Sequence, residues 1–166
     1  MKEEYVLYIL MRTDLPSMNP GKAMAQSSHA SNKFVFDVKN KNVKSLSEED
    51  EFLYGQAKLW QYQTDQGFGT VLVLGSKLKD IEKLMKIGQL PDSNYFCGQV
   101  VDPTYPYIID SEIVGLVDPT VHTINKQMVS DNKSLCFRKE ITCAYAFSEK
   151  NNPLLKMVIG RLSLHP

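Results

Sequence analysis

The sequence predicts a single α/β domain spanning residues 1–166, a three-layer α/β/α sandwich on a small mixed β-sheet. Short apolar stretches typical of buried strands alternate with longer segments whose apolar residues recur at helical spacing. The later strand candidates have no helices between them, which favours a mixed sheet over a purely parallel one. With 166 residues, 43% of them hydrophobic, the chain is long enough to bury a substantial core.

The first strand and helix are marked clearly. Residues 5–11, YVLYILM, are apolar at every position, which indicates a strand buried on both faces. A loop with turn chemistry follows, and then Asn19 is a good N-cap and Pro20 suits the first helical position. We expect a helix from there to about Val38.

A second helix carries the apolar and aromatic residues between Phe52 and Tyr62. Ser45 lies three residues before a glutamate, which is capping-box spacing, and Ser47 is an alternative N-cap. Since glycine favours helix ends, we expect this helix to stop near Gly67 or Gly69.

The middle of the chain predicts a strand and a helix. Residues 70–75, TVLVLG, are a second buried strand. Ser76 is expected to cap a helix over residues 77–87, which has one apolar stripe and is followed by Gly88.

Further strands are expected after this helix. Residues 95–101 form a candidate that should end at VDPTYP, because two prolines force an extended or turning backbone. Residues 111–117 and 135–147 are strand candidates, and residues 152–162 predict a final helix whose RLSL end could instead form a short strand.

Composition narrows the function classes. Nineteen basic and nineteen acidic residues cancel, so a polyanion would have to bind a local patch. Three cysteines without a CxxC pair argue against a disulfide framework or a zinc site and favour a reducing compartment. The N-terminus has no signal-peptide layout and no apolar run approaches membrane-spanning length, so we expect a cytoplasmic protein.

One helix face carries candidate chemistry. At about 100° per residue, Lys22, Gln26, His29 and Lys33 fall on the same side of the first helix, while alanines and serines cover much of the rest. The helix start also offers unpaired N–H groups and a partial positive charge. Together with the Lys22 ammonium, it predicts an anion or oxyanion site beside a titratable group.

From the residues alone, plainer interpretations stay open. PGK lacks the second glycine and the Ser or Thr of a phosphate-binding loop. Lysines in a first helical turn are usually solvated, and a lone helical histidine is often structural. Asp102 lies at the end of a predicted strand, where α/β folds place reactive groups, but it could equally be a turn residue before Pro103.

Residues 9–31, ILMRTDLPSMNPGKAMAQSSHAS, resemble the opening motif of type 2 peptidyl-tRNA hydrolases. The matching positions, with one common spacing, are Arg12, Asp14, Leu15, Met18, Gly21, Lys22, Ala25, Gln26, His29 and Ala30. Looser similarity continues through GFGTVLVL to the closing LLKMVIGRLSL, and residues from about 111 to 139 look like an insertion.

The resemblance implies a homodimeric enzyme that hydrolyses the ester between a peptide and tRNA without a metal or other cofactor. Lys22 would bind phosphate or stabilise the oxyanion, and His29 would orient or deprotonate water, directly or through Gln26. Asp102 would be the acidic partner.

The remaining predicted site residues would contact the substrate or support the site. Arg12 and Asp14 would brace the loop under the site. Gln26, Thr104 and Lys33 complete the expected substrate-binding residues.

The sequence departs from the family in one loop. Where the family has the glycine, arginine and threonine of a D-A-G-R-T-Q segment, this chain has Thr104, Tyr105 and Pro106. The hydroxyl of the family's threonine and the phosphate-binding guanidinium of its arginine are therefore missing, and Thr104 is close in sequence but not equivalent to that threonine. Two alternatives follow: an inactive member of the fold that binds RNA or a protein, and a hydrolase of a different small ester or amide.

Overall fold

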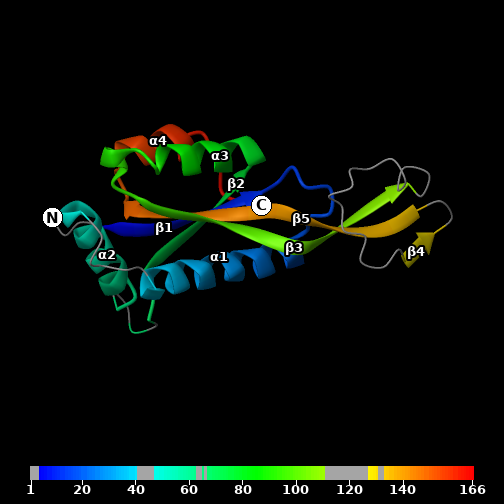
Figure 1. The fold of residues 1–166 in the computed structure, drawn as a ribbon, viewed down its shortest axis with the longest axis horizontal. Helices are drawn as coiled ribbons and strands as arrows, with labels where there is room; N and C mark the ends of the chain where they lie inside the picture. Colours follow the sequence, from blue (N-terminus) through cyan, green and yellow to red (C-terminus); the bar gives the residue numbers. More distant parts are fainter. Residues whose placement is uncertain (1–3, 41–46, 63–64, 66, 111–126, 131–132) are drawn as a thin grey trace.

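The computed structural model describes residues 4–40, 47–62, 65, 67–110, 127–130 and 133–166 (Figure 1). Within these residues the order of elements is β1 (Tyr5–Arg12), α1 (Pro20–Asn40), α2 (Glu48–Trp60), β2 (Thr70–Ser76), α3 (Leu78–Ile87), the 3-10 turn η2 (Pro91–Ser93), β3 (Phe96–Asp110), β4 (Gln127–Ser130), β5 (Lys133–Glu149) and α4 (Pro153–Ile159). The described strands form one mixed sheet in the order β2-β1-β5-β3, with β4 pairing β5. Helices α3 and α4 cover one face and α1 covers the other, so the predicted sandwich is confirmed.

The central strand β1 is buried at all eight positions, as its composition predicts. It pairs in parallel with β2 and antiparallel with β5. Its side chains alternate between faces: Tyr8 and Leu10 pack towards α3 and α4, whereas Leu7 and Ile9 pack towards α1 and α2. Burial on both faces explains why the strand carries no charged residue before Arg12, its last position.

Helix α1 begins as predicted and extends two residues beyond Val38. The Asn19 side chain accepts a hydrogen bond from the backbone N–H of Lys22 at 2.9 Å, which is N-cap geometry. The face turned to the sheet is mostly apolar, but it includes one buried amide; its residues are Ala23, Gln26, Ala30, Phe34 and Val38.

For helix α2, one of the two predicted N-caps is confirmed and the predicted C-terminal end is wrong. The Ser47 hydroxyl accepts from the N–H of Asp50 at 3.2 Å, whereas Ser45 lies outside the described residues. The helix stops at Trp60, so the prediction that it reaches Gly67 or Gly69 is wrong. Trp60 is buried edge-on against Phe34, and this anchor fixes where the chain leaves the helix.

The cap predicted for α3 is also wrong. Ser76 is the last residue of β2, and its hydroxyl donates to the carbonyl of Met11 at 3.1 Å. Lys77 is the N-cap, and its N–H donates to the Asp80 carboxylate at 2.9 Å. The helix itself spans Leu78–Ile87 and is followed by Gly88, as expected.

Strand β3 is longer than the sequence predicts. It was expected to end near Val101, yet it continues through the prolines to Asp110. The register shifts between Asp102 and Tyr105, and this irregularity takes up the extra residues around Pro103. Among the described strands β3 lies at the sheet edge, where proline is tolerated because one side needs no ladder hydrogen bonds.

The C-terminal half of the chain is partly as predicted. The expected strand over 135–147 lies within β5, and α4 is shorter than the expected 152–162, with Asn152 as its N-cap. Leu164 forms an isolated bridge with Leu74, which agrees with the short-strand alternative for RLSL. The strand expected over 111–117 lies outside the described residues.

The paired ends of β3 and β5 extend the sheet into an arm beyond the helices, with β4 on β5 (Figure 1). Residues 133–139, the last part of the predicted insertion, form the beginning of β5. No helix among the described residues is both long and apolar enough to cross a membrane.

Candidate functional site

The candidate site centres on the Asp102 carboxylate, at the root of the arm. Gln26 of α1 donates from Nε2 to Asp102 Oδ2 at 2.9 Å. The backbone N–H of Thr104 donates to Oδ1 at 2.9 Å, and its hydroxyl lies 3.5 Å from the same oxygen. Three residues predicted from sequence therefore meet in the structure, and the carboxylate is held from two directions.

The Gln26 amide is itself oriented by a residue that sequence analysis missed. Thr142 of β5 is fully buried and donates from its hydroxyl to Gln26 Oε1 at 2.6 Å. With the amide oxygen committed to this bond, the amide nitrogen must face Asp102. Gln26 is therefore a fixed donor, because both ends of a buried amide need partners.

Lys22 is half-buried in the first turn of α1, beside the same segment of β3. Its ammonium nitrogen lies 5.4 Å from the centroid of the Tyr105 ring, within the range of a cation–π interaction. Tyr105 is only 1% exposed and follows Asp102 by three residues. The ring thus holds the cation on the side of α1 where the carboxylate lies.

His29 and Lys33 share the predicted helix face but lie farther along α1. His29 is exposed, and its role as a water-handling residue stays a prediction. Lys33 pairs with Asp37 one turn later at 3.0 Å, and Asp37 in turn accepts from the Tyr145 hydroxyl at 2.6 Å. This pairing gives Lys33 a structural contact, while its predicted contact with substrate stays a prediction.

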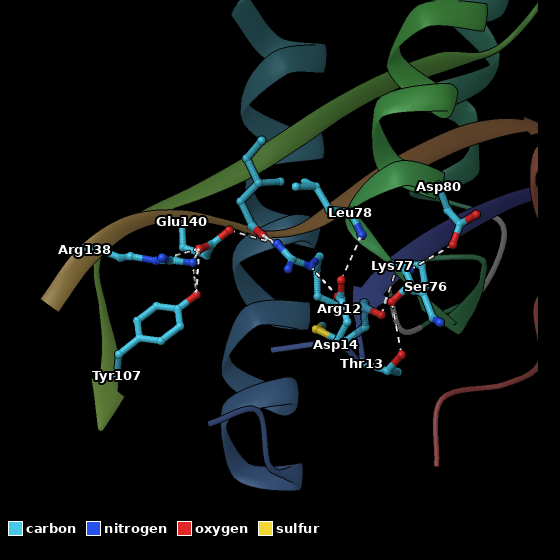
Figure 2. Close-up of polar contacts among 12 residues, drawn as sticks. Arg12, Thr13, Asp14, Ser76, Lys77, Leu78, Asp80, Tyr107, Arg138 and Glu140 are labelled. Atoms are coloured by element: carbon cyan, nitrogen blue, oxygen red, sulfur yellow. Dashed lines mark hydrogen bonds and ion pairs between the residues drawn. The ribbon is translucent and has the colours of Figure 1, made fainter. Parts of the chain in front are cut away.

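Arg12 and Asp14 brace the loop between β1 and α1 (Figure 2). Arg12 is buried and donates from Nε to Asp14 at 2.6 Å and from Nη1 to Glu140 at 2.8 Å. Burial lowers the pKa of Arg12, but its hydrogen bonds and charge pairing with both carboxylates outweigh that effect and raise it. Asp14 also lies 3.5 Å from the N–H of Leu78, which ties the loop to the start of α3.

Glu140 joins this brace to the arm. Its Oε2 accepts from the Tyr107 hydroxyl at 2.6 Å and from Arg138 Nη2 at 2.6 Å. Burial raises the pKa of Glu140, but hydrogen bonds from Tyr107, Arg138 and Arg12 outweigh it and hold the pKa below its usual range. Burial raises the pKa of Tyr107, and its bond to Glu140 raises it further.

Sequence analysis missed this part of the site, although a signal was present. Arg138, Glu140 and Thr142 occupy alternate positions of the predicted strand, a period that places these polar side chains on one face. Their partners lie on β1, α1 and β3, so only the tertiary structure assigns them to this site.

A groove of about 780 Å³ runs along the other side of α1. Its lining includes Met24, Ser28, Phe68 and Val71, and the polar residues around Asp102 do not contribute to it. Among the described residues, no three His, Cys, Asp or Glu side chains gather as a set of metal ligands.

Comparison with protein-family models identifies the family of this chain. The family model for peptidyl-tRNA hydrolase PTH2 matches residues 5–89. The chain belongs to the PTH2 family. The matched segment runs from β1 to the end of α3 and contains Arg12, Lys22 and Gln26. A search of curated proteins found no match to this chain.

The PTH2 match ends at residue 89, before Asp102, so the contact between Asp102 and the matched segment is known only from the structure. Gln26, inside the matched segment, donates to Asp102, outside it. The matched segment thus contacts the root of the arm through this hydrogen bond.

Proposed function

We propose that this PTH2 protein hydrolyses the ester bond of peptidyl-tRNA, releasing peptide and free tRNA. The single observation that carries the proposal is the oriented Asp102 carboxylate, which Gln26 connects to the helix bearing Lys22. Family membership indicates the substrate class. Ester hydrolysis needs an activated water and a stabilised oxyanion, and this neighbourhood offers an acceptor and a cation for those tasks.

The roles follow from the chemistry of each group. Asp102 accepts hydrogen bonds on both oxygens and has lone pairs left to orient a water molecule. Lys22, together with the N–H groups at the start of α1, would bind a phosphate or the developing oxyanion. His29, farther along the same helix face, would orient or deprotonate the water directly or through Gln26. Thr104 and Lys33 would contact substrate.

Hydrolysis of a peptidyl-tRNA mimic tests the proposal. Lys22→Ala should lower kcat/KM on the order of 10²-fold if the ammonium supports the oxyanion. Asp102→Asn should also lower turnover, because an amide in place of the carboxylate is a weaker acceptor. Lys86→Ala is the matched control, since Lys86 is an exposed lysine on α3 across the sheet. Wild-type protein that leaves the substrate intact over a range of salt and pH contradicts the proposal.

The altered loop favours a second candidate, a binding module without turnover. Tyr105 is buried within β3 at a position where the resembled family has a polar loop, so this chain could retain RNA binding after losing catalysis. Binding of tRNA by a chain that never cleaves the ester would support this alternative.

Two further proposals concern the setting of the protein. We expect a homodimer, because the resembled family usually forms one, and light scattering coupled to size-exclusion chromatography measures this directly. We also expect a cytoplasmic location. Cys136 and Cys143 are free thiols, which fits a reducing compartment.

A further inference from the structure

Two cations flank a pair of tyrosine rings on the arm. Lys22 lies over Tyr105, as described above, and the Tyr105 and Tyr107 rings meet edge to face with centroids 5.4 Å apart. Arg138 lies with its guanidinium carbon 4.0 Å from the Tyr107 centroid. The rings therefore connect the helix start to a second positive group farther out on the arm.

The Arg138 guanidinium is held in one orientation. Its Nε and Nη2 donate to Glu140 at 3.0 and 2.6 Å, and Nη2 also donates to the Tyr107 hydroxyl at 2.8 Å (Figure 2). These contacts all involve the edge of the guanidinium formed by Nε and Nη2. A group stacked on a ring and fixed along one edge loses little further freedom when its other edge binds a ligand.

Arg138 is the more exposed partner of its ion pair with Glu140. The Arg138 side chain is 43% exposed, whereas the Glu140 side chain beneath it is only 10% exposed and also pairs with buried Arg12. Glu140 pairs with both arginines and Arg12 also pairs with Asp14, so these four charges balance one another. Arg138 is therefore the outward-facing member of the network.

The register places Arg138 beside the candidate site. Asp102 is opposite Glu140, and Tyr105 is opposite Arg138. Two residues along a strand span about 7 Å, so Arg138 lies about that far along the arm from the position opposite Asp102. An RNA end whose ester reached Asp102 would bring its last phosphates near this face of the arm.

We propose that Arg138 is a substrate-binding residue that contacts a phosphate of the terminal nucleotides of the RNA, with Tyr107 and Glu140 as positioning residues. This inference rests on the proposed function for its substrate class. An arginine binds phosphate oxygens through paired N–H groups, and a held guanidinium does so at lower entropic cost.

Binding of deacylated tRNA, measured by fluorescence anisotropy across a salt series, tests the inference without requiring hydrolysis. Arg138→Ala should raise Kd roughly tenfold at low salt and reduce the slope of log K against log salt by about 0.7–0.9, as expected for one lost phosphate contact. Arg138→Lys should retain the wild-type slope but recover only part of the affinity, because lysine keeps the positive charge and lacks the paired N–H groups of the guanidinium.

The neighbouring residue provides a matched control. Lys139 is exposed and is adjacent to Arg138 in β5, so strand alternation directs it to the opposite face. Lys139→Ala removes the same formal charge and should leave the slope unchanged. Tyr107→Phe keeps the ring but removes the hydroxyl that contacts Arg138 and Glu140, and should weaken binding a few-fold, by roughly one neutral hydrogen bond.

The outcomes separate this inference from the proposed function. Arg138-dependent tRNA binding without ester cleavage supports the inference and contradicts hydrolysis. If the wild-type protein cleaves the ester and Arg138→Ala binds tRNA with wild-type affinity and salt slope, the result supports hydrolysis and overturns the inference. Equal effects of Lys139→Ala and Arg138→Ala, or no tRNA binding by the wild-type chain, also overturn the inference.

Discussion

Replacing Glu140 by glutamine should destabilise the protein substantially. Glu140 accepts hydrogen bonds from Arg12, from two nitrogens of Arg138 and from the Tyr107 hydroxyl, all between 2.6 and 3.0 Å. A neutral amide offers one acceptor oxygen in place of two charged ones, and its NH₂ group faces donors. The Glu140→Gln variant therefore leaves Arg12 with a weaker partner in a buried position.

The expected magnitude follows from the burial of each partner. The side chains of Arg12 and Glu140 are 7% and 10% exposed, and losing one partner of such a buried pair costs about 3–5 kcal/mol. Arg12 keeps its bonds to Asp14 and to the Ile141 carbonyl, which places the cost at the lower end. Arg138 is 43% exposed, so its pair adds only ~0–1 kcal/mol. We expect a loss of about 3 kcal/mol and a decrease in Tm of ~6–12 °C.

The loss should depend on pH in a defined direction. Although burial raises the pKa of Glu140, its hydrogen bonds hold the pKa below the unfolded value. The ionised carboxylate therefore stabilises the fold above the ordinary glutamate pKa, about 4.3, and this stabilisation is lost as pH falls through the lower folded-state pKa. The difference between wild type and Glu140→Gln should be constant from about pH 6 to 8 and shrink below about pH 4.

Urea unfolding at several pH values measures both effects, with Arg138→Ala as the control that removes the exposed pair and the Arg138 contacts with Tyr107 but leaves Arg12 and Glu140 paired. At neutral pH this control should cost about 1 kcal/mol or less. A Glu140→Gln variant within about 0.5 kcal/mol of wild type, the range of ordinary surface substitutions, would refute the reasoning. So would an Arg138→Ala variant that costs as much as Glu140→Gln.

Three further substitutions test individual contacts. Thr142→Val removes the hydroxyl that orients the Gln26 amide, so kcat should fall roughly tenfold with KM unchanged in steady-state kinetics, whereas Thr142→Ser should retain activity. An unchanged kcat in the Thr142→Val variant contradicts this role. Gly98→Ala should cost about 1–3 kcal/mol in urea unfolding, because a Cβ there would lie 2.6 Å from the Tyr145 ring; wild-type stability would show that the ring can move aside. Asn152→Ala should cost about 2 kcal/mol in urea unfolding, because it removes the α4 cap and two bonds to backbone carbonyls. Asn152→Ser keeps a cap acceptor and should recover part of that loss, whereas Asn152→Asp should not, because its second oxygen would face the two carbonyl oxygens.

Local chemistry explains which elements the sequence predicts well. An apolar run on both faces marks β1, and an asparagine followed by proline marks the start of α1. Both signals act within a few residues, through side-chain burial and through capping of free N–H groups.

Where the predictions are wrong, a distant contact overrides the local signal. Two prolines predict the end of β3, but β5 supplies an antiparallel partner on both sides of Pro103, which the register shift accommodates, and Pro106 is paired with Phe137. Glycines predict a longer α2, but burial of Trp60 against Phe34 ends it earlier. Ser76 has a capping side chain, but the Met11 carbonyl on the neighbouring strand accepts its hydrogen bond.

The sequence by itself determined the fold class, the family motif and the helix face that carries Lys22 and Gln26, because periodicity and spacing are properties of neighbouring residues. Only the tertiary structure decided that Asp102 meets that face, that Thr142 orients the amide between them, and that Glu140 joins two arginines. Except for the pair of Arg138 and Glu140, which are two positions apart, those contacts join residues 76 to 128 positions apart, and sheet register rather than local propensity sets which of them face one another.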